Sequence, residues 1–587
     1  MTNRILVMNL TRMGDLIQST PLISGLRKKH PDASITMMVC KEFEAFASRI
    51  PFVDDLIVYD VLQFTRRKER GESVTWDVIY RYFEDLLRGV MERRFDLIFN
   101  LSHSKLSALM ITYMGHNNVR GFFCNQTGDR MTHQPWLQYF GIEPFNRVYN
   151  SFNLVDIYLR SGEVESQFDQ VMIKTEPEDF AAAGDILRRE NIQDDDFLIG
   201  FQAGSSLEGR RWPTRSFAEL GDRLAANLNA KIVLFGVESE SGQAREILAL
   251  SKMKDRFIDL TGKTTISQLI GLLKRCRYLV TNDTGTMHIA AALGTRIVGL
   301  FFAHAHPHET GPYGEGHLVF RARIACAPCS YGVECNNVVC IQKVRPEDVY
   351  SLMQAHVQHG EWKAPERARL SDEIDIVRSG FDPNGLLQFT PLIKRGVTRQ
   401  DILILAYREM WPDSLARSDS AKLAVRQSLA PLVRTLKESF DVAAADSVRQ
   451  DLQQDLLLFQ ELRQISQTGA TIGKKIWKRT LRKNFDAAKI ETLGQRIAEL
   501  DERIDMLGMT HPQVKPLTDM FNKRKENLDG DDVSRLAGET VHCYTRLGRE
   551  SARMVEIIAG LAESCGGSPP AGFHAGLSSI KVAVPGK

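Results

Sequence analysis

The feature that most constrains the fold is an alternation of short apolar runs with amphipathic segments, which continues from Met1 to about Ile341. The runs are rich in β-branched residues and have the length of strands, whereas the segments between them have helical spacing. This alternation is typical of βαβ units, in which helices connect parallel strands. We therefore expect an α/β fold with parallel sheets in this part of the chain.

The predicted strands fall into two sets, separated by an acidic, loop-like stretch from Gln193 to Asp196. The first set comprises residues 5–10, 35–39, 56–58 and 96–100, and the second comprises residues 197–202, 231–235, 278–281 and 296–301. We interpret the two sets as two Rossmann-like domains, residues 1–165 and 166–362. Ligands of such domains bind at the carboxyl ends of the strands, so the segments that follow the strands are expected to carry the chemistry.

The sequence changes character after about Trp362, where strand-like runs stop, and residues 432–511 contain no proline. We expect residues 363–587 to form a helical domain, with a loosely ordered tail after Gly566. Six apolar residues follow a 3-4-3-4-3 spacing: Ile490, Leu493, Ile497, Leu500, Ile504 and Leu507. Such an a/d seam packs within one chain or forms a dimer zipper. Fewer than three heptads do not separate the two, and we favour packing within the chain.

Length and charge restrict the class of protein. A chain of 587 residues can form two or three sizeable domains, and a formal charge of +2 argues against a general nucleic-acid binder. The longest apolar runs, such as Ile297 to Ala303, are far shorter than the ~18 residues of a membrane span. The N-terminus lacks the pattern of a secretory signal, so we expect a cytoplasmic protein.

The first candidate site follows the opening strand, where Gly14 and Asp15 lie at the start of a helix. Gly14 permits a tight turn close to a ligand, and the carboxylate of Asp15 could accept a proton there. Asp is also a favoured helix-capping residue. On residue chemistry alone, capping is at least as well supported as catalysis.

The second candidate site contains Gly204 and Ser205, followed by Arg210 and Arg211. Small residues at the end of a strand let backbone N–H groups face a phosphate, and either guanidinium could supply paired donors to it. A Gly-Ser pair is also common in ordinary loops, so this motif has little weight by itself.

The third candidate site is the most informative, because a strand ends in polar residues and continues into an Ala-rich helix. Its residues are Asp283, Thr284, Gly285, Thr286 and His288. The N-terminus of such a helix presents unpaired N–H groups and the positive end of the helix dipole, which suit a diphosphate. The alternative is a simple turn with Asp283 or Thr284 as the N-cap. The segment has neither a Walker loop nor a G-x-G-x-x-G fingerprint.

At these places the sequence resembles glycosyltransferase family 9, the heptosyltransferases of lipopolysaccharide core assembly. The resemblance covers about residues 1 to 350. The motifs that carry it are Ile5 to Asp15 with Pro21, Gly204-Ser205 with Arg211-Trp212-Pro213, Phe235-Gly236 with Glu240, and Asn282 to Gly285 with His288. Four ordered motifs point to the family and leave the acceptor open.

The resemblance implies a GT-B architecture, in which two Rossmann-like domains face each other across a cleft and the second binds the nucleotide sugar. Asp15 matches the family's proposed general base. The residues matched to the donor are Gly204, Ser205, Arg210, Arg211, Glu240, Asp283, Thr284, Gly285, Thr286 and His288. Glu240 is the better match to an adenosine-binding glutamate, although Glu238 is close by. Arg210 replaces a frequent Lys, which changes the hydrogen-bond geometry.

The activity implied by the resemblance is inverting transfer of a heptose from an ADP-heptose-like donor to a lipopolysaccharide core or a related surface glycan. The partners are then the nucleotide-sugar donor and a glycolipid or glycan acceptor, and no cofactor or metal is required. The alternatives are an epimerase or hydrolase on the same scaffold, or an assembly protein with a helical interaction domain.

A cysteine cluster follows the second set of strands: Cys326, Cys329, Cys335 and Cys340. The spacing C-x2-C-x5-C-x4-C matches neither a zinc ribbon nor a ferredoxin run, so the cluster is a weak metal candidate. Reduced thiols or disulfides in a structural loop are the favoured interpretation. The three alternating histidines nearby, His304, His306 and His308, contact the ligands or lie exposed on a loop, and we favour ligand contact slightly.

A basic segment lies in the helical region, with six cations between Lys474 and Lys483 interleaved with Ile476, Trp477 and Leu481. The cations are Lys474, Lys475, Lys478, Arg479, Arg482 and Lys483. A solvated helix face is the commoner meaning of such a run. The alternative is peripheral contact with an anionic membrane, which would place the protein at the inner face of the inner membrane.

Overall fold

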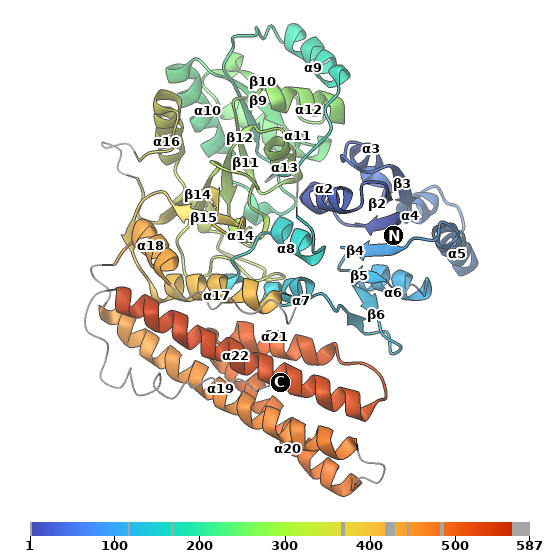
Figure 1. Cartoon of the computed structure of the whole chain (residues 1–587). Coiled ribbons are helices and arrows are strands. Elements are labelled where there is room, and N and C mark those ends of the chain that lie inside the picture. Colours follow the sequence, from blue (N-terminus) through green and yellow to red (C-terminus); the bar gives the residue numbers. More distant parts are fainter. Residues whose placement is uncertain are drawn as a thin grey trace. The chain divides into compact units, whose positions relative to one another are not determined.

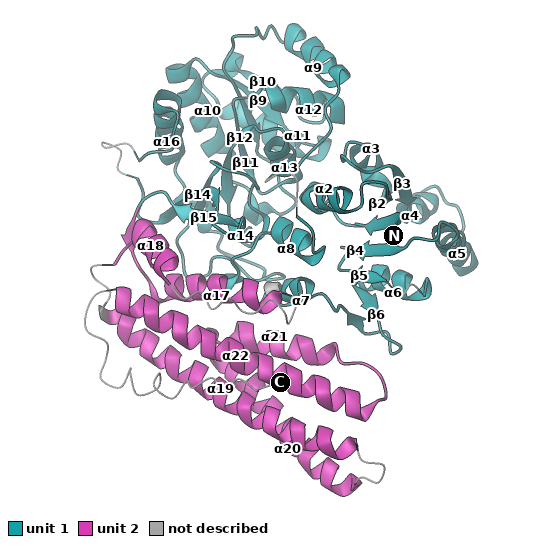
Figure 2. Cartoon of the chain, in the orientation of Figure 1, with its two compact units in different colours: residues 1–393 teal, residues 394–587 magenta. Residues whose placement is uncertain are grey.

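The structure is a computed structural model that describes residues 3–115, 118–165, 170–364, 370–416, 429–442, 446–481 and 486–565. The chain divides into two compact units, residues 1–393 and residues 394–587 (Figure 2). The first unit contains both predicted parallel sheets, and the second is mainly helical (Figure 1). The structure thus confirms an α/β part followed by a helical part.

The first sheet has five parallel strands in the order β3-β2-β1-β4-β5. The strands are β1 (Arg4–Met8), β2 (Ser34–Cys40), β3 (Asp55–Tyr59), β4 (Leu97–Asn100) and β5 (Val119–Gly121). The accompanying helices are α1 (Met13–Gln18), α2 (Thr20–Lys29), α3 (Glu44–Ala47), α4 (Leu62–Glu69), α5 (Trp76–Glu92), α6 (Lys105–Tyr113), α7 (Pro135–Ile142) and α8 (Leu154–Ser161). The strand order reverses between β1 and β4, so the topological switch point lies there.

The second sheet has eight strands in the order β10-β9-β8-β11-β12-β13-β14-β15. The first six, which pair in parallel, are β8 (Leu198–Gln202), β9 (Lys231–Phe235), β10 (Phe257–Asp259), β11 (Tyr278–Asn282), β12 (Arg296–Phe301) and β13 (Leu318–Ala322). The helices are α9 (Pro177–Arg189), α10 (Thr214–Leu228), α11 (Ser241–Leu250), α12 (Ile266–Arg275), α13 (Gly285–Ala292), α14 (Pro307–Thr310), α15 (Cys340–Lys343) and α16 (Pro346–His359). Its switch point lies between β8 and β11.

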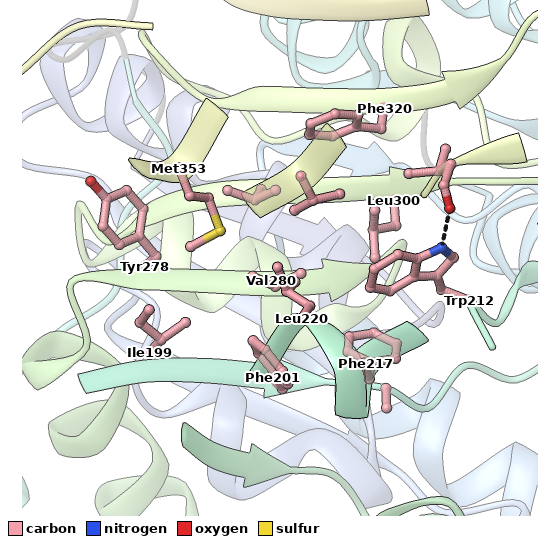
Figure 3. Packing of buried hydrophobic residues seen from close by; sticks show 14 of the residues in the cluster. Ile199, Phe201, Trp212, Phe217, Leu220, Tyr278, Val280, Leu300, Phe320 and Met353 are labelled. Carbon is pink, nitrogen blue, oxygen red and sulfur yellow. Dashed lines mark hydrogen bonds between the residues drawn. The ribbon is translucent and has the colours of Figure 1, made fainter. Parts of the chain in front are cut away.

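The core of the second sheet explains why its strands are nearly continuous apolar runs. Every residue of β8 and β11 is buried, because helices cover both faces of the sheet. Figure 3 shows the packing of one face, where Trp212 and Phe217 lie edge to face with 5.0 Å between ring centroids. The indole N–H of Trp212 donates to the carbonyl of Val344 at 2.9 Å, which satisfies the one polar atom of that side chain.

Two strands of the second sheet lie beyond residue 362, so the expectation that strands stop there is wrong. They are β14 (Ile374–Phe381) and β15 (Leu387–Pro391), which extend the second sheet with antiparallel pairing. Asp375 of β14 pairs with Arg321 and Arg323 next to it, at 3.0 Å in each case. Charged residues interrupt the apolar run of this strand, and for that reason the periodicity of the sequence did not reveal it. The boundary between the two compact units falls after Ile393.

The second unit is built on two long helices, α19 (Asp446–Thr480) and α22 (Val533–Ser564), which pack against each other along their length (Figure 1). The other elements are α17 (Arg399–Leu415), α18 (Ala430–Ser439), α20 (Ala487–Thr510), α21 (Lys515–Glu526) and the short strands β16 (Arg395–Gly396) and β17 (Phe440–Asp441). In the described part of the chain, no helix combines the length and apolar character needed to cross a bilayer. The predicted loose tail after Gly566 lies outside the described residues.

The predicted a/d seam lies on α20, and its residues Ile497 and Ile504 are buried. The helix packs against α19 and α21 of the same chain. The seam therefore packs within the chain, which is the alternative favoured above.

Gly469 is a point of close approach of α19 to α22. A Cβ atom at this position would lie 2.2 Å from the ring of the buried Tyr544 on α22. Gly494 of α20 provides the contrast, because it is exposed and a Cβ there would have no neighbour within 4 Å.

We expect Gly469→Ala to lower the free energy of unfolding of the helical unit by roughly 1 to 3 kcal/mol, since the added methyl group overpacks the interface. Gly494→Ala should raise it by up to about 1 kcal/mol, because alanine is the better helix former. Urea unfolding followed by circular dichroism measures both. Equal effects of the two substitutions would contradict a close α19–α22 contact at Gly469.

Candidate active site

The candidate active site lies where the switch points of the two sheets meet. Helix α1 begins at Met13, shortly after β1, and helix α13 begins at Gly285, shortly after β11. These two helices pack against each other. The three candidate segments of the sequence analysis follow β1, β8 and β11, and they therefore lie close together. We call this region the switch-point interface.

Two glycines permit this close contact. A Cβ at Gly14 would lie 2.9 Å from Cδ2 of His288, and a Cβ at Gly285 would lie 2.7 Å from Cε of Met13. A larger residue at either position would force α1 and α13 apart. The glycines thus bring Asp15, one residue after Gly14, close to the start of α13.

Asp15 caps α1 through one of its two carboxylate oxygens. It is the third residue of α1, and its Oδ2 accepts the backbone N–H of Arg12 at 3.0 Å, which is a capping contact. Asn9 donates to its backbone carbonyl at 3.1 Å. Among the described residues none donates to the other carboxylate oxygen, Oδ1, which leaves that oxygen available to accept a proton.

His103, which the sequence analysis did not single out, lies near Asp15. It follows β4, and the loops after β1 and β4 are joined by Leu10, whose N–H donates to Oγ of Ser102 at 2.7 Å. Burial lowers the pKa of His103, and the nearby Asp15 carboxylate opposes that effect. Only the register of β1 beside β4 brings these segments together, so no local pattern could have identified His103.

Asp283 is held by an ion pair with Arg210 at 3.0 Å, and both side chains are largely buried. Oγ1 of Thr310 lies 3.4 Å from the same carboxylate oxygen, and Arg210 also donates to Oγ of Ser206 at 2.8 Å. Burial raises the pKa of Asp283, while Arg210 opposes that shift and the Asp15 carboxylate adds to it. The effect of Asp15 shows that the two carboxylates are electrostatic neighbours.

Asn282 connects the loop after β8 with the loop after β11. Its Nδ2 donates to the carbonyls of Ala203 and Gly204 at 2.7 and 3.3 Å, and its Oδ1 accepts the N–H of Trp212 at 3.1 Å. Nε of Arg211 donates to the carbonyl of Ser205 at 2.9 Å. Arg211 therefore holds this loop in shape, and Asn282 is an organising residue that was not among the predicted site residues.

The N-terminus of α13 has no side-chain cap. Thr284 is the N-cap residue and its side chain makes no capping hydrogen bond, so it leaves the first N–H groups of the helix, including those of Gly285 and Thr286, uncapped. Among the described residues, Ser205 Oγ after β8 and His288 Nδ1 on α13 are buried without a hydrogen-bond partner, as are Gln202 Oε1 at the end of β8 and Thr261 Oγ1 after β10. Buried polar groups are rarely left unpaired, so these atoms are candidates for contact with a polar ligand.

Glu240 lies against the loop that follows β8. Its Oε2 accepts hydrogen bonds from Gln202 and from the N–H of Val237, each at 3.0 Å. A Cβ at Gly204 would lie 2.0 Å from the carboxyl group of Glu240, so the two residues are in tight contact. Glu238 instead packs on Gly262, where a Cβ would lie 2.1 Å from its Oε2. Of the two glutamates, only Glu240 lies against Gly204.

The cysteine cluster contains free thiols. Cys326, Cys329, Cys335 and Cys340 form no disulfide. Within the residues that the structure describes, no group of three or more His, Cys, Asp or Glu side chains is arranged to hold a metal ion. The cluster loop is tied to the segment after β12, because the N–H of Cys329 donates to the carbonyl of Ala303 at 3.0 Å.

The three alternating histidines are not exposed loop residues. His306 is buried, and its ring lies 5.3 Å from that of His308. Burial lowers the pKa of His304 to about 4 and that of His306 well below its usual value. His304 and His306 are therefore neutral near pH 7.

Part of the chain is similar to known proteins. Residues 84–337 match the family model described as glycosyltransferase family 9 (heptosyltransferase). The chain is 27% identical over 342 residues to lipopolysaccharide heptosyltransferase 2 of Salmonella typhimurium, an alignment that covers 54% of this chain and 88% of that protein. It is 25% identical to the protein of the same name from Escherichia coli strain K12, with the same coverage of both chains.

Among solved structures, the chain is similar to the one titled E. coli ADP-heptose lps heptosyltransferase II. The similarity covers 61% of this chain and 99% of that chain, with 20% sequence identity and a TM-score of 0.45.

The buried His288 gives the unit an acid-sensitive element. Burial lowers the pKa of His288 to about 4, against 6.5 for an ordinary histidine. Between these values the unfolded chain binds a proton that the folded chain does not. The free energy of unfolding should therefore fall as the pH decreases from about 6.5 to 4.

From this shift we expect His288 to cost the protein about 2 kcal/mol of stability between pH 7.5 and pH 5. His288→Gln, which cannot titrate, should show a correspondingly smaller loss over this interval in urea unfolding, whatever its stability at pH 7.5. The matched control is His359→Gln at the exposed end of α16, which should keep the wild-type loss. If His288→Gln and the wild type lose equal stability, His288 is not buried as a neutral ring.

Proposed function

Because this chain is a glycosyltransferase whose matched segment, residues 84–337, belongs to family 9, we propose that it transfers a heptose from an ADP-heptose-like donor to a lipopolysaccharide core or related surface-glycan acceptor. The names of its relatives favour heptose as the sugar and lipopolysaccharide as the acceptor. The open N-terminus of α13 suits a diphosphate, which a nucleotide-sugar donor carries.

One observation carries the proposal, the contact of α1 with α13 through Gly14 and His288. It brings a carboxylate from one Rossmann-like half close to an anion-binding helix start from the other. Transfer between a donor and an acceptor needs such a pairing of a base with a leaving-group site. We assign the acceptor side to residues 1–165 and the donor side to the second sheet.

In this mechanism Asp15 acts as the general base. Its Oδ2 is fixed by the N–H of Arg12, so Oδ1 removes the proton from the acceptor hydroxyl. The hydroxyl oxygen then attacks the anomeric carbon from the face opposite the diphosphate. The new glycosidic bond forms as the bond to the nucleotide breaks, and the configuration inverts.

The leaving diphosphate gains negative charge, and the start of α13 is suited to stabilise it. The N–H groups of Gly285 and Thr286 and the positive end of the helix dipole would face the phosphates. Arg210 adds a cation, held in place by Asp283. The carboxylate of Asp283 is then positioned for the donor sugar, and Gly204, Ser205 and Glu240 for the adenosine side.

We expect Asp15→Asn to reduce turnover by at least ~100-fold, the lower end of a general-base contribution. The amide can still accept the N–H of Arg12, so the helix remains capped, but it cannot take a proton. ADP release from ADP-heptose in the presence of a lipopolysaccharide-core acceptor measures turnover, and calorimetry with ADP should give nearly the wild-type affinity.

The matched control is Asp348→Asn, which removes the carboxylate at the same capping-box position of α16. It should leave turnover near the wild-type value. Near-normal turnover of Asp15→Asn would show that Asp15 only caps α1. Release of ADP without an acceptor, or preference for another nucleotide sugar in a donor panel, would point to a hydrolase or another transferase.

We also propose that the C-terminal end of α19 rests on an anionic membrane surface at the inner face of the inner membrane. Lys474, Lys475, Lys478 and Arg479 form no ion pair with a carboxylate among the described residues. Trp477 beside them is 41% exposed and Leu481 is 65% exposed. Arg482 and Lys483, which belong to the same predicted segment, lie outside the described residues.

The start of α22 lies beside this end of α19, because Gly473 contacts Val541 and Trp477 contacts Gly538. Its first residue, Val533, is 51% exposed and adds apolar surface. Asp532 caps α22 and adds negative charge nearby. The attraction to an anionic surface therefore depends on the cations of α19, with the exposed apolar side chains adding to it.

The wild type should sediment with vesicles that contain phosphatidylglycerol at low salt, and replacement of the four described cations by Gln should reduce this binding severalfold. Binding should also weaken as salt rises, because salt screens the attraction. The matched control removes four positive charges from the first unit and should bind like the wild type. Its substitutions to Gln are at Arg245, Lys252, Lys254 and Arg256. Absence of wild-type binding at low salt would leave the segment as a solvated face.

A further inference from the structure

Arg147 connects the two Rossmann-like halves of the first unit. It lies in a single 3-10 turn, residues 147–149, between α7 and α8, and pairs with Glu309 of α14. The pair is bidentate, with Nε to Oε1 at 3.0 Å and Nη2 to Oε2 at 2.6 Å. The side chains are only 3% and 8% exposed. Paired geometry of this kind fixes the direction of both groups as well as their distance.

The same guanidinium holds two loops of the second half. Its Nη1 donates to the carbonyl of Cys329 at 2.6 Å, and its Nη2 also donates to the carbonyl of His304. The ring of Tyr331 lies 4.2 Å from the guanidinium carbon, within the range of a cation–π contact. Arg147 thus fastens the loop after β12, residues 302–310, to the loop after β13, residues 323–339.

The loop after β12 reaches the donor side of the switch-point interface directly. Glu309 is followed by Thr310, whose hydroxyl lies 3.4 Å from Oδ2 of Asp283. Asp283 is the partner of Arg210. A displacement of α14 would therefore move Thr310 away from Asp283 and alter the surroundings of that carboxylate.

We propose that Arg147 is a positioning residue that shapes the sugar-binding side of the donor site from the opposite half of the unit. It acts through Glu309 and the loop carbonyls and does not itself contact the reacting atoms. Loss of one partner of a buried ion pair leaves the other charge unpaired, so the loops would rearrange when Arg147 is neutralised. The effect on catalysis rests on the proposed function, whereas the effect on the loops does not.

Arg49 provides a matched comparison. It lies after α3 in the first half and pairs with Asp179 of α9 at 2.9 Å, and it also donates to Oγ of Ser267 at 2.8 Å. Its side chain is 15% exposed and that of Asp179 is fully buried. Arg49 thus joins the two halves as Arg147 does, but its partners lie in α9 and α12 and not in the loops around Asp283.

The experiment compares Arg147→Gln, Glu309→Gln and Arg49→Gln with the wild type. In the ligand-free protein, hydrogen exchange should increase in peptides from residues 302–310 and 323–339 for the first two variants only. In steady-state assays with ADP-heptose, the same two variants should raise the donor KM at least ~10-fold. ADP affinity should change less than ~3-fold, since the diphosphate contacts on α13 remain. Arg147→Lys keeps the charge and should give an intermediate KM, which covers the case in which Arg147→Gln fails to fold.

Unchanged exchange in both loops would overturn the proposal whatever the enzyme's substrate. A donor KM within twofold of the wild type in folded Arg147→Gln would overturn it as well. An equal increase of the donor KM in Arg49→Gln would show that the loss of any ion pair between the halves raises KM, and that Arg147 has no specific role. If the wild type does not use ADP-heptose or bind ADP, the proposed function fails, and the exchange data still decide whether Arg147 positions the loops.

Discussion

The structure of the candidate site depends on the contact between the starts of α1 and α13. Asp15 follows a strand of the first sheet and the start of α13 follows a strand of the second, so neither sheet alone carries both. Gly14 and Gly285 remove the side chains that would keep the two helix starts apart. Asp15 consequently lies within electrostatic range of Asp283, and the two charges are tolerated because Arg210 pairs with Asp283. At this one interface, the glycines allow close helix packing and the Arg210–Asp283 ion pair offsets the repulsion between the two carboxylates.

Buried polar side chains give this interface its shape. Asn282 fixes the loop after β8 through three hydrogen bonds, Arg211 fixes the same loop through a backbone carbonyl, and Arg147 fixes the loops after β12 and β13. Each of these groups is satisfied within the protein, whereas Ser205 and His288 keep unpaired polar atoms beside α13. Groups that are paired internally build the site, and groups that are left unpaired mark where a ligand would bind.

The helical unit follows a different rule, because its order depends on close helix packing more than on polar contacts. Gly469 lets α19 approach the ring of Tyr544, and Ile497 and Ile504 bury the inner face of α20. A buried pair, Arg524 with Glu550 at 2.6 Å, joins α21 to α22. Lys474, Lys475, Lys478 and Arg479 at the end of α19 form no ion pair with a carboxylate among the described residues, which is consistent with an external anionic surface.

The sequence by itself determined the two parallel sheets, because strand length and β-branched composition are local properties, and all eight of the predicted strands are present. It also determined the chemistry of the loops that follow β1, β8 and β11. It missed β5, β10, β13 and β15, and it missed β14, where Asp375 interrupts the apolar pattern and pairs with Arg321 on β13 and with Arg323 just after it. Tertiary structure alone decided that Arg211 supports a loop, that Glu240 and not Glu238 lies against Gly204, and that His103 and Arg147 belong near the site. These assignments depend on contacts between residues far apart in the chain, which local pattern does not encode.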